Sequence, residues 1–460
     1  MRSASVPPRT ARRFYIAVGC TLLLGASSAA TQALPNQPDG FGMANTAAHA
    51  ATGVVLADEK PGDEQEAPRT AGRSIPPPDG FVPEPRFIAR PIKLLSNRLL
   101  AKGGQLTNGF YPEFSNMITG SGWVSIGPGY RHWLFGDRAI VDASTALSWR
   151  MYKTAQGRFE FTNLARSRLA VGSQVRWQDL TQVSYFGPGP ESLEADHSQY
   201  RMKSTDVVAY ATVRPMRSLA IVGRVGWLNS PTILPPGGTF KNHPDTRTVF
   251  PDDQVYALDE QPSFLHGEAS FTSDTRDSRS RPSSGGVYRA AWTAYSDRDA
   301  GAFSFRRYEA EAAQFVPLAS GRVVLALHAW VVASDTDAGG ELPFYLMPTL
   351  GGSNTMRAYS EYRFQDRNLL VATVESRFAL TTHVDVAGFV DAGDVAPRLS
   401  GLDLGKTSYG LGVRVHTERA TFGRLDVAHG AEGWRFLFRT SDPLHLSRLS
   451  RRTAAAPFVP

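Results

Sequence analysis

A single cysteine, Cys20, is present in 460 residues, and it lies in an apolar run close to the N-terminus. A chain with one thiol forms no internal disulfide and offers no Cys/His spacing for zinc. The apolar run itself, residues 14–25, is too short to cross a bilayer as a helix. These shortages exclude a disulfide-stapled scaffold and cysteine redox chemistry.

An excess of charge of one sign is also lacking. The formal charge is +6, but residues 1–33 carry four arginines and no acid, which leaves 45 Lys+Arg against 43 Asp+Glu in the remainder. Nucleic-acid binding requires basic residues clustered on one face, and this balance gives it no support. We therefore expect no nucleic-acid partner.

The N-terminus does have the layout of a secretory signal peptide. Four arginines precede the apolar run, and small residues follow it in ASSAATQA. A lipoprotein site at AVGC, residues 17–20, is disfavoured because the apolar run continues beyond the cysteine. The next stretch is rich in Pro, Gly, Ala and acid and has no sustained apolar period. We assign residues 1–33 to a signal peptide and residues 34–104 to a disordered or extended linker.

Beyond residue 93, apolar and polar residues alternate in stretches of about ten, the length that a tilted strand needs to cross a membrane. In RRYEAEAAQF, the alternation sets Tyr308, Ala310 and Ala312 against Arg307, Glu309 and Glu311. A soluble β-sandwich or propeller would bury the charged set at a large desolvation cost, whereas a polar lumen accepts it and leaves the apolar set for lipid. The sequence therefore predicts an all-β transmembrane antiparallel β-barrel over residues 105–441.

Strand number and connection length support this fold. Counting back from the C-terminus gives about 16 strands starting near Gln105, and single-chain bacterial barrels have even numbers. Short connections are expected at residues 135–137, 215–217, 318–320 and 381–382, and long ones at 187–198, 229–261 and 334–367. With both termini in the periplasm, the long set is extracellular. We place the protein in the bacterial outer membrane, with residues 442–460 as a C-terminal tail.

One long connection differs from the others in composition. The stretch LGGSNTMRAYSEYRF, residues 350–364, holds Gly351, Gly352, Arg357 and Tyr359 and has no helix or strand period. The overlapping segment LPFYLMPTLGGSNTMRAY, residues 342–359, resembles the sixth extracellular loop of the BamA/TamA superfamily, the bacterial surface-antigen family, in which two glycines precede an Arg-Gly-Tyr or Arg-Gly-Phe tripeptide. Ala358 stands where that family has glycine, which is expected to hinder a tight turn.

The resemblance continues downstream. FVDAGDV matches the family's F-x-D-x-G strand motif through Phe389, Asp391 and Gly393. YGLGVRV and GRLDVAHG look like its last strands but one, and DTRDSRSRPSSGG resembles its turn into the central strands. The resemblance implies a barrel whose long extracellular loop folds inward. Because the linker cannot bury a core, the chain resembles the barrel-only branch without POTRA domains.

Two acids that the strand alternation places on the lumen side suggest how the loop is held. If Val390 faces lipid, Asp391 faces the lumen, and so does Glu375 on the preceding strand. An arginine–carboxylate fork is directional and strong away from bulk water. We expect Arg357 to bind Asp391 or Glu375 with Tyr359 packed beside it, which would lock the loop. The alternative is a set of solvated charges at a pore mouth, where a pair contributes about 0–1 kcal/mol.

Motifs for other chemistry are lacking. The sequence contains no G-x-S-x-G elbow, H-E-x-x-H helix or phosphate loop, so we expect no catalytic residue and no cofactor. His266 and Glu268 share one strand face, and Asp252 and Asp253 share a long loop. Polar residues are usual at both kinds of site, so no metal is expected.

Three classes of function compete. The loop and strand motifs favour an assembly or translocation barrel, with a first-to-last seam weakened by Gly103, Gly104 and Gly109. The charged lumen and the lack of POTRA domains favour a passive pore for small solutes. A hydrolase would need a Ser/His constellation that the sequence does not reveal. We expect non-catalytic outer-membrane biogenesis or protein or lipid translocation. The expected partners are outer-membrane lipids, the barrel assembly machinery for its own insertion, and unfolded outer-membrane proteins or lipids as substrates.

Overall fold

The computed structural model describes residues 80–82, 108–116, 124–238, 243–250, 255–279, 281–417, 421–439, 444 and 452–453. The expected signal peptide, residues 1–33 with Cys20, lies outside the described residues, as does the linker apart from residues 80–82. Gly103, Gly104, residues 105–107, Asp252 and Asp253 lie outside them too. Among the helices of the described part, none has the length and apolar character needed to cross a membrane.

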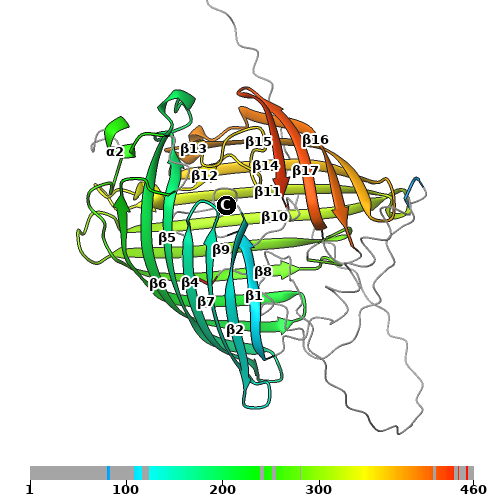
Figure 1. Cartoon of the computed structure of the whole chain (residues 1–460), viewed down its shortest axis with the longest axis horizontal. Coiled ribbons are helices and arrows are strands. Elements are labelled where there is room, and N and C mark those ends of the chain that lie inside the picture. Colours follow the sequence, from blue (N-terminus) through cyan, green and yellow to red (C-terminus); the bar gives the residue numbers. More distant parts are fainter. Residues whose placement is uncertain are drawn as a thin grey trace, which may run out of the picture. The chain divides into compact units, whose positions relative to one another are not determined.

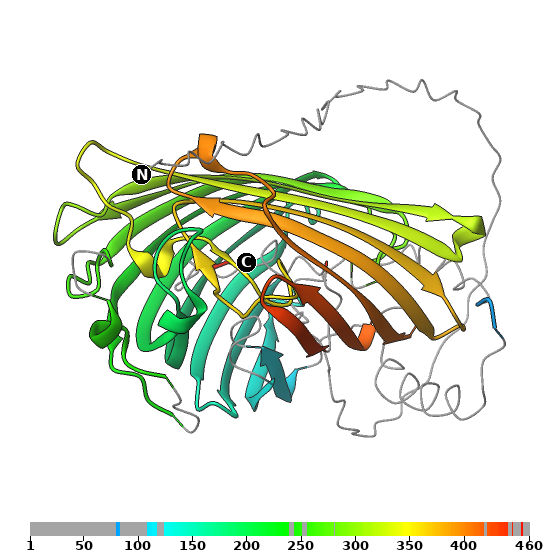
Figure 2. The same ribbon diagram turned by 90° about the horizontal axis from the view of Figure 1, so that it is seen from above.

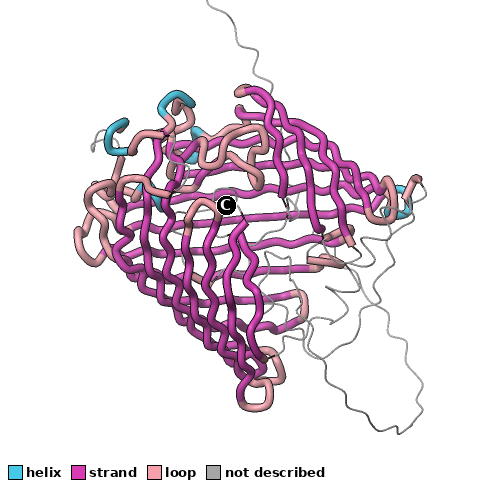
Figure 3. Tube along the Cα trace, in the orientation of Figure 1, coloured by secondary structure: helices cyan, strands magenta, loops and turns pink. Residues whose placement is uncertain are grey.

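One sheet of sixteen antiparallel strands dominates the structure, and each strand pairs with the strands next to it in the sheet order (Figure 1). The strands are β1 (Gly109–Asn116), β2 (Val124–Leu134), β3 (Ala139–Ser148), β4 (Lys153–Leu164), β5 (Leu169–Tyr185), β6 (Ser198–Met216), β7 (Leu219–Leu234), β8 (Phe264–Asp274), β9 (Gly285–Asp297), β10 (Phe305–Leu318), β11 (Val323–Thr336), β14 (Asn368–Ala379), β15 (Val384–Ala396), β16 (Lys406–His416), β17 (Thr421–Gly430) and β18 (Gly433–Arg439). Strands make up nearly all of the regular structure (Figure 3). The predicted all-β antiparallel barrel of about 16 strands is confirmed.

The two faces of each strand differ in chemistry. On β10, Tyr308 is 50% exposed on the outer face, whereas the inward-facing Arg307 and Glu311 are 1% and 5% exposed. Leu265 and Phe271 on β8 are likewise exposed, while His266 and Glu268 between them are buried. The predicted alternation, with apolar residues outward and charged residues inward, therefore describes the sheet.

The predicted short and long connections lie at opposite ends of the strands as expected, but two long ones are shorter than predicted. The connection after β7 begins at residue 235, because β7 continues to Leu234 through the turn-like stretch NSP. A β-bulge in the pairing of β6 with β7, between Lys203 and Thr205, absorbs this irregular stretch. The connection after β11 begins at residue 337, because β11 continues to Thr336. The predicted starts at residues 229 and 334 were wrong.

The long connection between β11 and β14 folds inward, as predicted. It contains the 3-10 turn η4 (Phe344–Leu346) and the paired short strands β12 (Thr349–Leu350) and β13 (Phe364–Gln365). Figure 2 shows these elements enclosed by the curved sheet. Apolar side chains of this loop, including Leu350, Met356 and Tyr359, form one buried cluster with residues of the barrel wall. The loop is thus part of the packed interior.

Candidate functional site

Arg357 lies at the centre of the inward-folded loop and is 2% exposed. Its Nε and Nη2 atoms donate to the two carboxylate oxygens of Asp391 at 3.0 and 2.8 Å. Its Nη1 atom donates to Glu375 at 2.7 Å, and its backbone N–H donates to Asp391 at 3.2 Å. Burial alone would lower the pKa of Arg357, but the carboxylates of Asp391 and Glu375 hold it well above its usual value. Arg357 therefore stays charged and bridges two strands.

Sheet register places the partners of Asp391. Thr373 on β14 and Ser408 on β16 stand directly opposite Asp391 on β15. Their hydroxyl groups donate to its carboxylate at 3.1 and 2.9 Å. Together with the fork of Arg357, these bonds satisfy the acceptor sites of a buried carboxylate. Asp391 is therefore held in one orientation by both neighbouring strands as well as by the loop.

Glu375 is shared by three arginines. Besides Arg357, Arg377 on β14 and Arg414 on β16 each donate to its carboxylate at 2.8 Å. Asp426 on β17 lies 3.5 Å from Arg414 and 4.0 Å from Arg357. Both acids are fully buried. The charges form one network across β14 to β17, in which no single pair acts alone.

Glycines in the wall make room for this network. The ring of Phe389 leans over Gly410, where an added Cβ would lie 2.6 Å from Cζ of the ring. The guanidinium carbon of Arg357 sits 3.4 Å from the centroid of the same ring. The carboxylate of Asp426 likewise covers Gly412, where an added Cβ would lie 2.0 Å from Oδ1. A cation over an aromatic face gains a further attraction, so Phe389 contributes as well as the acids.

Gly393, Tyr359 and Ala358 contribute through packing and backbone conformation and carry no charge. Gly393 leaves a gap that Leu350 of the loop enters, since an added Cβ would lie 3.2 Å from its Cδ1. Tyr359 is 3% exposed and packs edge-on against Phe364 at 5.4 Å between ring centroids. Ala358 does not have a positive φ, and its Cβ lies over Gly430. The expected difficulty with alanine at position 358 does not arise, because the turn there needs no glycine.

Positive φ angles occur instead at Gly351 and Gly352, at +122° and +92°. An added Cβ at Gly351 would lie 2.2 Å from the carbonyl oxygen of Ser360. The backbone N–H of Gly352 donates to the carbonyl groups of Met356 and Tyr359, both at 3.1 Å. The two glycines thus allow the tight fold that presents Arg357.

Substitution Gly351→Ala is expected to destabilise the loop by more than the conformational penalty alone. A non-glycine residue in a sparsely populated backbone region costs about 1–3 kcal/mol, and here the clash with Ser360 adds to that cost. Gly339→Ala is the matched control, because Gly339 has φ +79° and open space around its Cβ position. Protease cleavage within residues 337–367 measures the effect. Equal sensitivity of the two variants would contradict this account.

Arginines of the last two strands hold the far side of the loop, and they were not predicted from the sequence. Arg424 donates to the backbone oxygen of Ser353 at 2.9 Å, and Arg439 donates to the hydroxyl of Ser353 at 3.1 Å. Arg435 donates to Ser360 at 2.8 Å. Arg424 and Asp426 lie in GRLDVAHG, where alternation alone would have given them the inward phase. The sequence did not reveal their partners, because no local pattern marks Ser353 or Ser360 as a residue that an arginine of the wall will contact.

A further contact joins the loop to an outer connection. Arg363 donates to the backbone oxygen of Ser192 at 2.8 Å and to Glu432 at 2.6 Å. Near it, His197 stacks between Phe186 at 4.2 Å and His243 at 3.5 Å, measured between ring centroids. Burial, then the positive charges of His243, Arg363 and Arg150, lower the pKa of His197 to about 4. The stack therefore contains a neutral His197 at pH 7.

Acidification is expected to loosen this stack. His197 has an ordinary pKa of 6.5 once the loop opens, and a folded pKa of about 4. The open loop therefore binds the proton first, so stability is complete above pH 6.5 and falls progressively as the pH drops toward 4. Hydrogen exchange of residues 186–197 at a series of pH values measures the effect. A His197→Gln variant should lose most of this dependence, and the rest is expected from His243, whose pKa is also lowered by burial. If the variant keeps the full dependence, another group is responsible.

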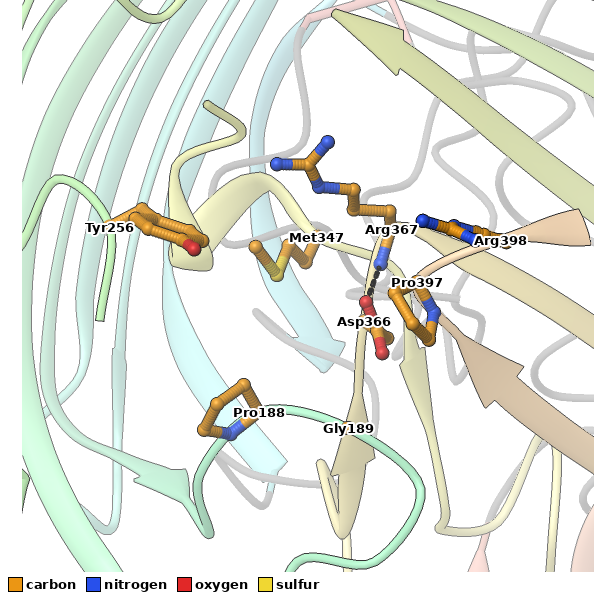
Figure 4. Close-up of a pocket in the computed structure, with 8 residues that line it drawn as sticks. All are labelled: Pro188, Gly189, Tyr256, Met347, Asp366, Arg367, Pro397 and Arg398. Atoms are coloured by element: carbon orange, nitrogen blue, oxygen red, sulfur yellow. Dashed lines mark hydrogen bonds between the residues drawn. The ribbon is translucent and has the colours of Figure 1, made fainter. Parts of the chain in front are cut away.

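A cavity of about 480 Å³ opens among the outer connections, and Figure 4 shows the residues around it. It is lined by Pro188, Gly189, Tyr256, Met347, Asp366, Arg367, Pro397 and Arg398. The backbone N–H of Arg367 donates to Asp366 at 2.7 Å, and burial raises the pKa of the Asp366 carboxyl group. None of the residues predicted to lock the loop lines this cavity. It is therefore separate from the Arg357 network.

His266 and Glu268, which share one strand face as metal ligands could, are paired with other side chains of the protein. Nε2 of His266 lies 2.7 Å from Asp206, and Glu268 pairs with Arg224 and Arg289 at 2.5 and 3.0 Å. Within the described ranges, no cluster of three or more His, Cys, Asp and Glu side chains is arranged to hold a metal ion. The polar side chains on the inner face of β6 to β10 are explained by a series of charged contacts between neighbouring strands.

Comparisons with known proteins agree with the geometry. Residues 239–431 match the Omp85 superfamily domain. The fold is similar to that of BamA from Haemophilus ducreyi lacking POTRA domains 1–3, with a TM-score of 0.54 and 12% identity over 73% of this chain and 70% of that chain. CdiB from Acinetobacter baumannii gives 0.44 and 13% over 72% and 58%, and CdiB from Escherichia coli gives 0.45 and 11% over 72% and 61%. No curated protein matches the sequence.

Proposed function

We propose that this chain, whose residues 239–431 match the Omp85 superfamily domain, assembles or translocates other polypeptides or lipids at the outer membrane without catalysing a reaction. The chain is a bacterial outer-membrane protein, and barrels of this superfamily function in outer-membrane protein assembly or in secretion and translocation. The observation that carries the proposal is the long loop between β11 and β14, folded inward onto the wall strands of the matched domain. Members of the superfamily are typically not enzymes.

We assign Arg357, Asp391 and Glu375 to a lock that holds this loop in the lumen. The fork to Asp391 and the bond to Glu375 are buried, so they are screened little by solvent or salt. Gly351 and Gly352 shape the loop, while Phe389 and Gly393 shape the wall that receives it. Tyr359 packs within the same apolar cluster as Phe389. The lock keeps the inner surface of β14 to β17 covered while the barrel handles a substrate.

The substrates that fit this role are unfolded outer-membrane proteins or lipids. Barrels similar to BamA work within outer-membrane assembly machinery and interact with substrate proteins. For this chain we propose that the same machinery inserts the barrel itself and that outer-membrane lipids surround its apolar outer face. The predicted domain limits, with a barrel over residues 105–441 preceded by a linker and followed by a tail, remain part of this proposal.

Reconstitution into lipid vesicles tests the proposed function. The purified barrel is mixed with a second, unfolded outer-membrane barrel, and the rate of folding of that second barrel is followed by its unheated gel migration. We expect faster folding than in vesicles without protein, together with small, fluctuating conductance in planar bilayers. An Arg357→Met barrel that is still folded should lose this stimulation. Identical rates with and without the barrel would reject the assembly role.

A passive pore for small solutes is the second candidate, and the inner wall supports it. Arg224, Glu268, Arg289 and Glu309 form a continuous row of ion pairs on β7 to β10. Such a row suits a lumen that water and ions enter. Large, steady, ion-selective conductance in the same bilayers would favour this function over assembly.

A further inference from the structure

Four connections of the barrel meet at the cavity of about 480 Å³. Its lining residues come from the segments between β5 and β6, β7 and β8, β11 and β14, and β15 and β16. Backbone hydrogen bonds join these segments to one another. The N–H of Gly189 donates to the carbonyl group of Gln365 at 2.8 Å, and the N–H of Phe344 donates to that of Tyr256 at 3.0 Å. The walls are therefore fixed by the fold, and the volume is that of a small-molecule site.

One wall carries a buried carboxylate without an ion-pair partner. Asp366 is 7% exposed, and among the described residues its side chain accepts one hydrogen bond, from the backbone N–H of Arg367 to Oδ1 at 2.7 Å (Figure 4). The other oxygen, Oδ2, faces Gly189, where an added Cβ would lie 3.9 Å away. Burial raises the pKa of this carboxyl group, the shift expected when the charged form is poorly compensated. An ammonium group of a ligand would supply the missing compensation.

Unpaired charge of the opposite sign lines the same cavity. Arg398 is exposed, and Arg367 is half-buried, with Nη1 donating to the hydroxyl group of Thr336 at 3.4 Å. Within the part of the chain that the structure describes, neither guanidinium group forms an ion pair, whereas Arg224 and Arg289 of the barrel wall are paired with acids. A guanidinium group presents a fork of donors that matches a carboxylate. The cavity therefore offers a place for an anionic group as well as for an ammonium group.

Apolar surface completes the cavity. Met347 is 4% exposed, and Tyr256 is half-buried. Figure 4 shows these two residues on one side of the cavity and Pro397 and Arg398 on the other. Methionine adapts its shape to an apolar neighbour, and the tyrosine ring adds a broad apolar face. A ligand that satisfies both charges would thus gain further affinity from an apolar part.

We infer that this cavity binds a free amino acid with an apolar side chain. The carboxylate of the amino acid binds Arg367 and Arg398, and its ammonium group binds Asp366. Its apolar side chain packs against Met347 and Tyr256. The inference does not depend on the proposed function, because the site lies apart from the lumen wall. Three of these residues belong to the connection between β11 and β14, so a bound amino acid stabilises the docked form of that loop.

Titration calorimetry of the full chain in detergent micelles tests the inference with phenylalanine as the probe. N-acetylphenylalanine lacks the ammonium group, and phenylalanine amide lacks the carboxylate. Each should bind about tenfold more weakly than phenylalanine, because a hydrogen bond between charged groups contributes about that factor or more. No saturable binding of phenylalanine, or equal affinity for the three compounds, would overturn the inference. Tighter binding of O-phosphoethanolamine than of phenylalanine would overturn the amino-acid assignment in favour of a lipid headgroup.

Arg398→Gln should weaken the binding of phenylalanine by about tenfold for the same reason. This variant should fold normally, because Arg398 is exposed and its side chain forms no ion pair with any described residue. The matched control is Arg306→Gln, at an arginine that is 51% exposed and does not line the cavity, and its affinity should equal that of the parent. Equal affinities of the two variants would overturn the assignment of the site.

Protection of the loop provides a second readout. Phenylalanine at about 100 times its dissociation constant should slow protease cleavage within residues 337–367 by up to about a hundredfold, because it binds the docked loop and not the open one. At the same concentration the slowing in Arg398→Gln should be about tenfold. Binding without slower cleavage would show that the amino acid lies elsewhere, and it would overturn the site.

Discussion

Replacement of Arg357 by methionine is expected to release the long loop from the lumen and to lower barrel stability by about 3–5 kcal/mol, the usual cost of breaking a buried ion pair by removing one partner. Methionine fills much of the same space but cannot donate to Asp391 or Glu375. Both carboxylates would then face each other and Asp426 with one cation fewer. Protease cleavage within residues 337–367 and the temperature at which unheated gel migration changes measure the two effects.

The control for this variant is Arg306→Met. Arg306 lies on the neighbouring strand β10, with a side chain that is 51% exposed and 3.6 Å from Asp337. An exposed pair of this kind contributes about 0–1 kcal/mol, so its removal should leave both measurements close to those of the parent. If Arg357→Met behaves like Arg306→Met, the loop is held by its apolar contacts and the lock does not exist.

Replacement of Glu375 by leucine is expected to be more damaging still. Glu375 accepts from Arg357, Arg377 and Arg414, so its loss leaves three buried guanidinium groups around a site without charge. We expect a loss at or above the upper end of about 3–5 kcal/mol, because more than one ion is left uncompensated. Most of the protein should fail to reach the fast-migrating folded form. Glu194→Leu, at an exposed outer position, should fold normally.

The combination of the two changes separates electrostatics from packing. Arg357→Met together with Glu375→Leu removes one cation along with the shared anion, so the double variant should lose less than the sum of the single losses. Coupling between contacting residues in one network is usually about 0.5–3 kcal/mol. Strict additivity would mean that Arg357 and Glu375 contribute independently, which the 2.7 Å contact between them argues against.

The sequence alone predicts which face of each strand points to lipid and which points to the lumen. Alternation around Glu309 and Val390 needs no tertiary information, because a strand must turn its polar set to water and its apolar set to lipid. The prediction that Arg357 meets Asp391 or Glu375 needed the loop resemblance in addition. The end of β7 was missed because Pro231 and its neighbours read as a turn, while a β-bulge, with two residues of β7 opposite Ser204 of β6, keeps them in the sheet.

Other features depend on contacts that no local pattern encodes. Nothing in the sequence distinguishes Asp426 from other inward-facing acids. Its role in the ion-pair network depends on the positions that Arg414 and Arg357 take in the folded barrel. The recess that takes Leu444, formed by inward-facing apolar residues of β9 to β11, reads from sequence as ordinary strand alternation. Only the contact with Leu444 shows that these apolar inward positions have an occupant.

The Arg357 network has a kinetic consequence. Every charged partner of Arg357 lies later in the chain, at positions 375, 391 and 426, so the ion pairs of Arg357 cannot form until β14 to β17 have paired. Loop docking is therefore expected as a late step in folding. Once the flanking strands have paired, docking closes only a short segment of chain and costs little conformational entropy. The same logic makes residues 349–439 one cooperative unit in the native state. Native-state hydrogen exchange should show Met356 and the β14 to β17 amides opening together; separate opening would show that docking and strand pairing are independent.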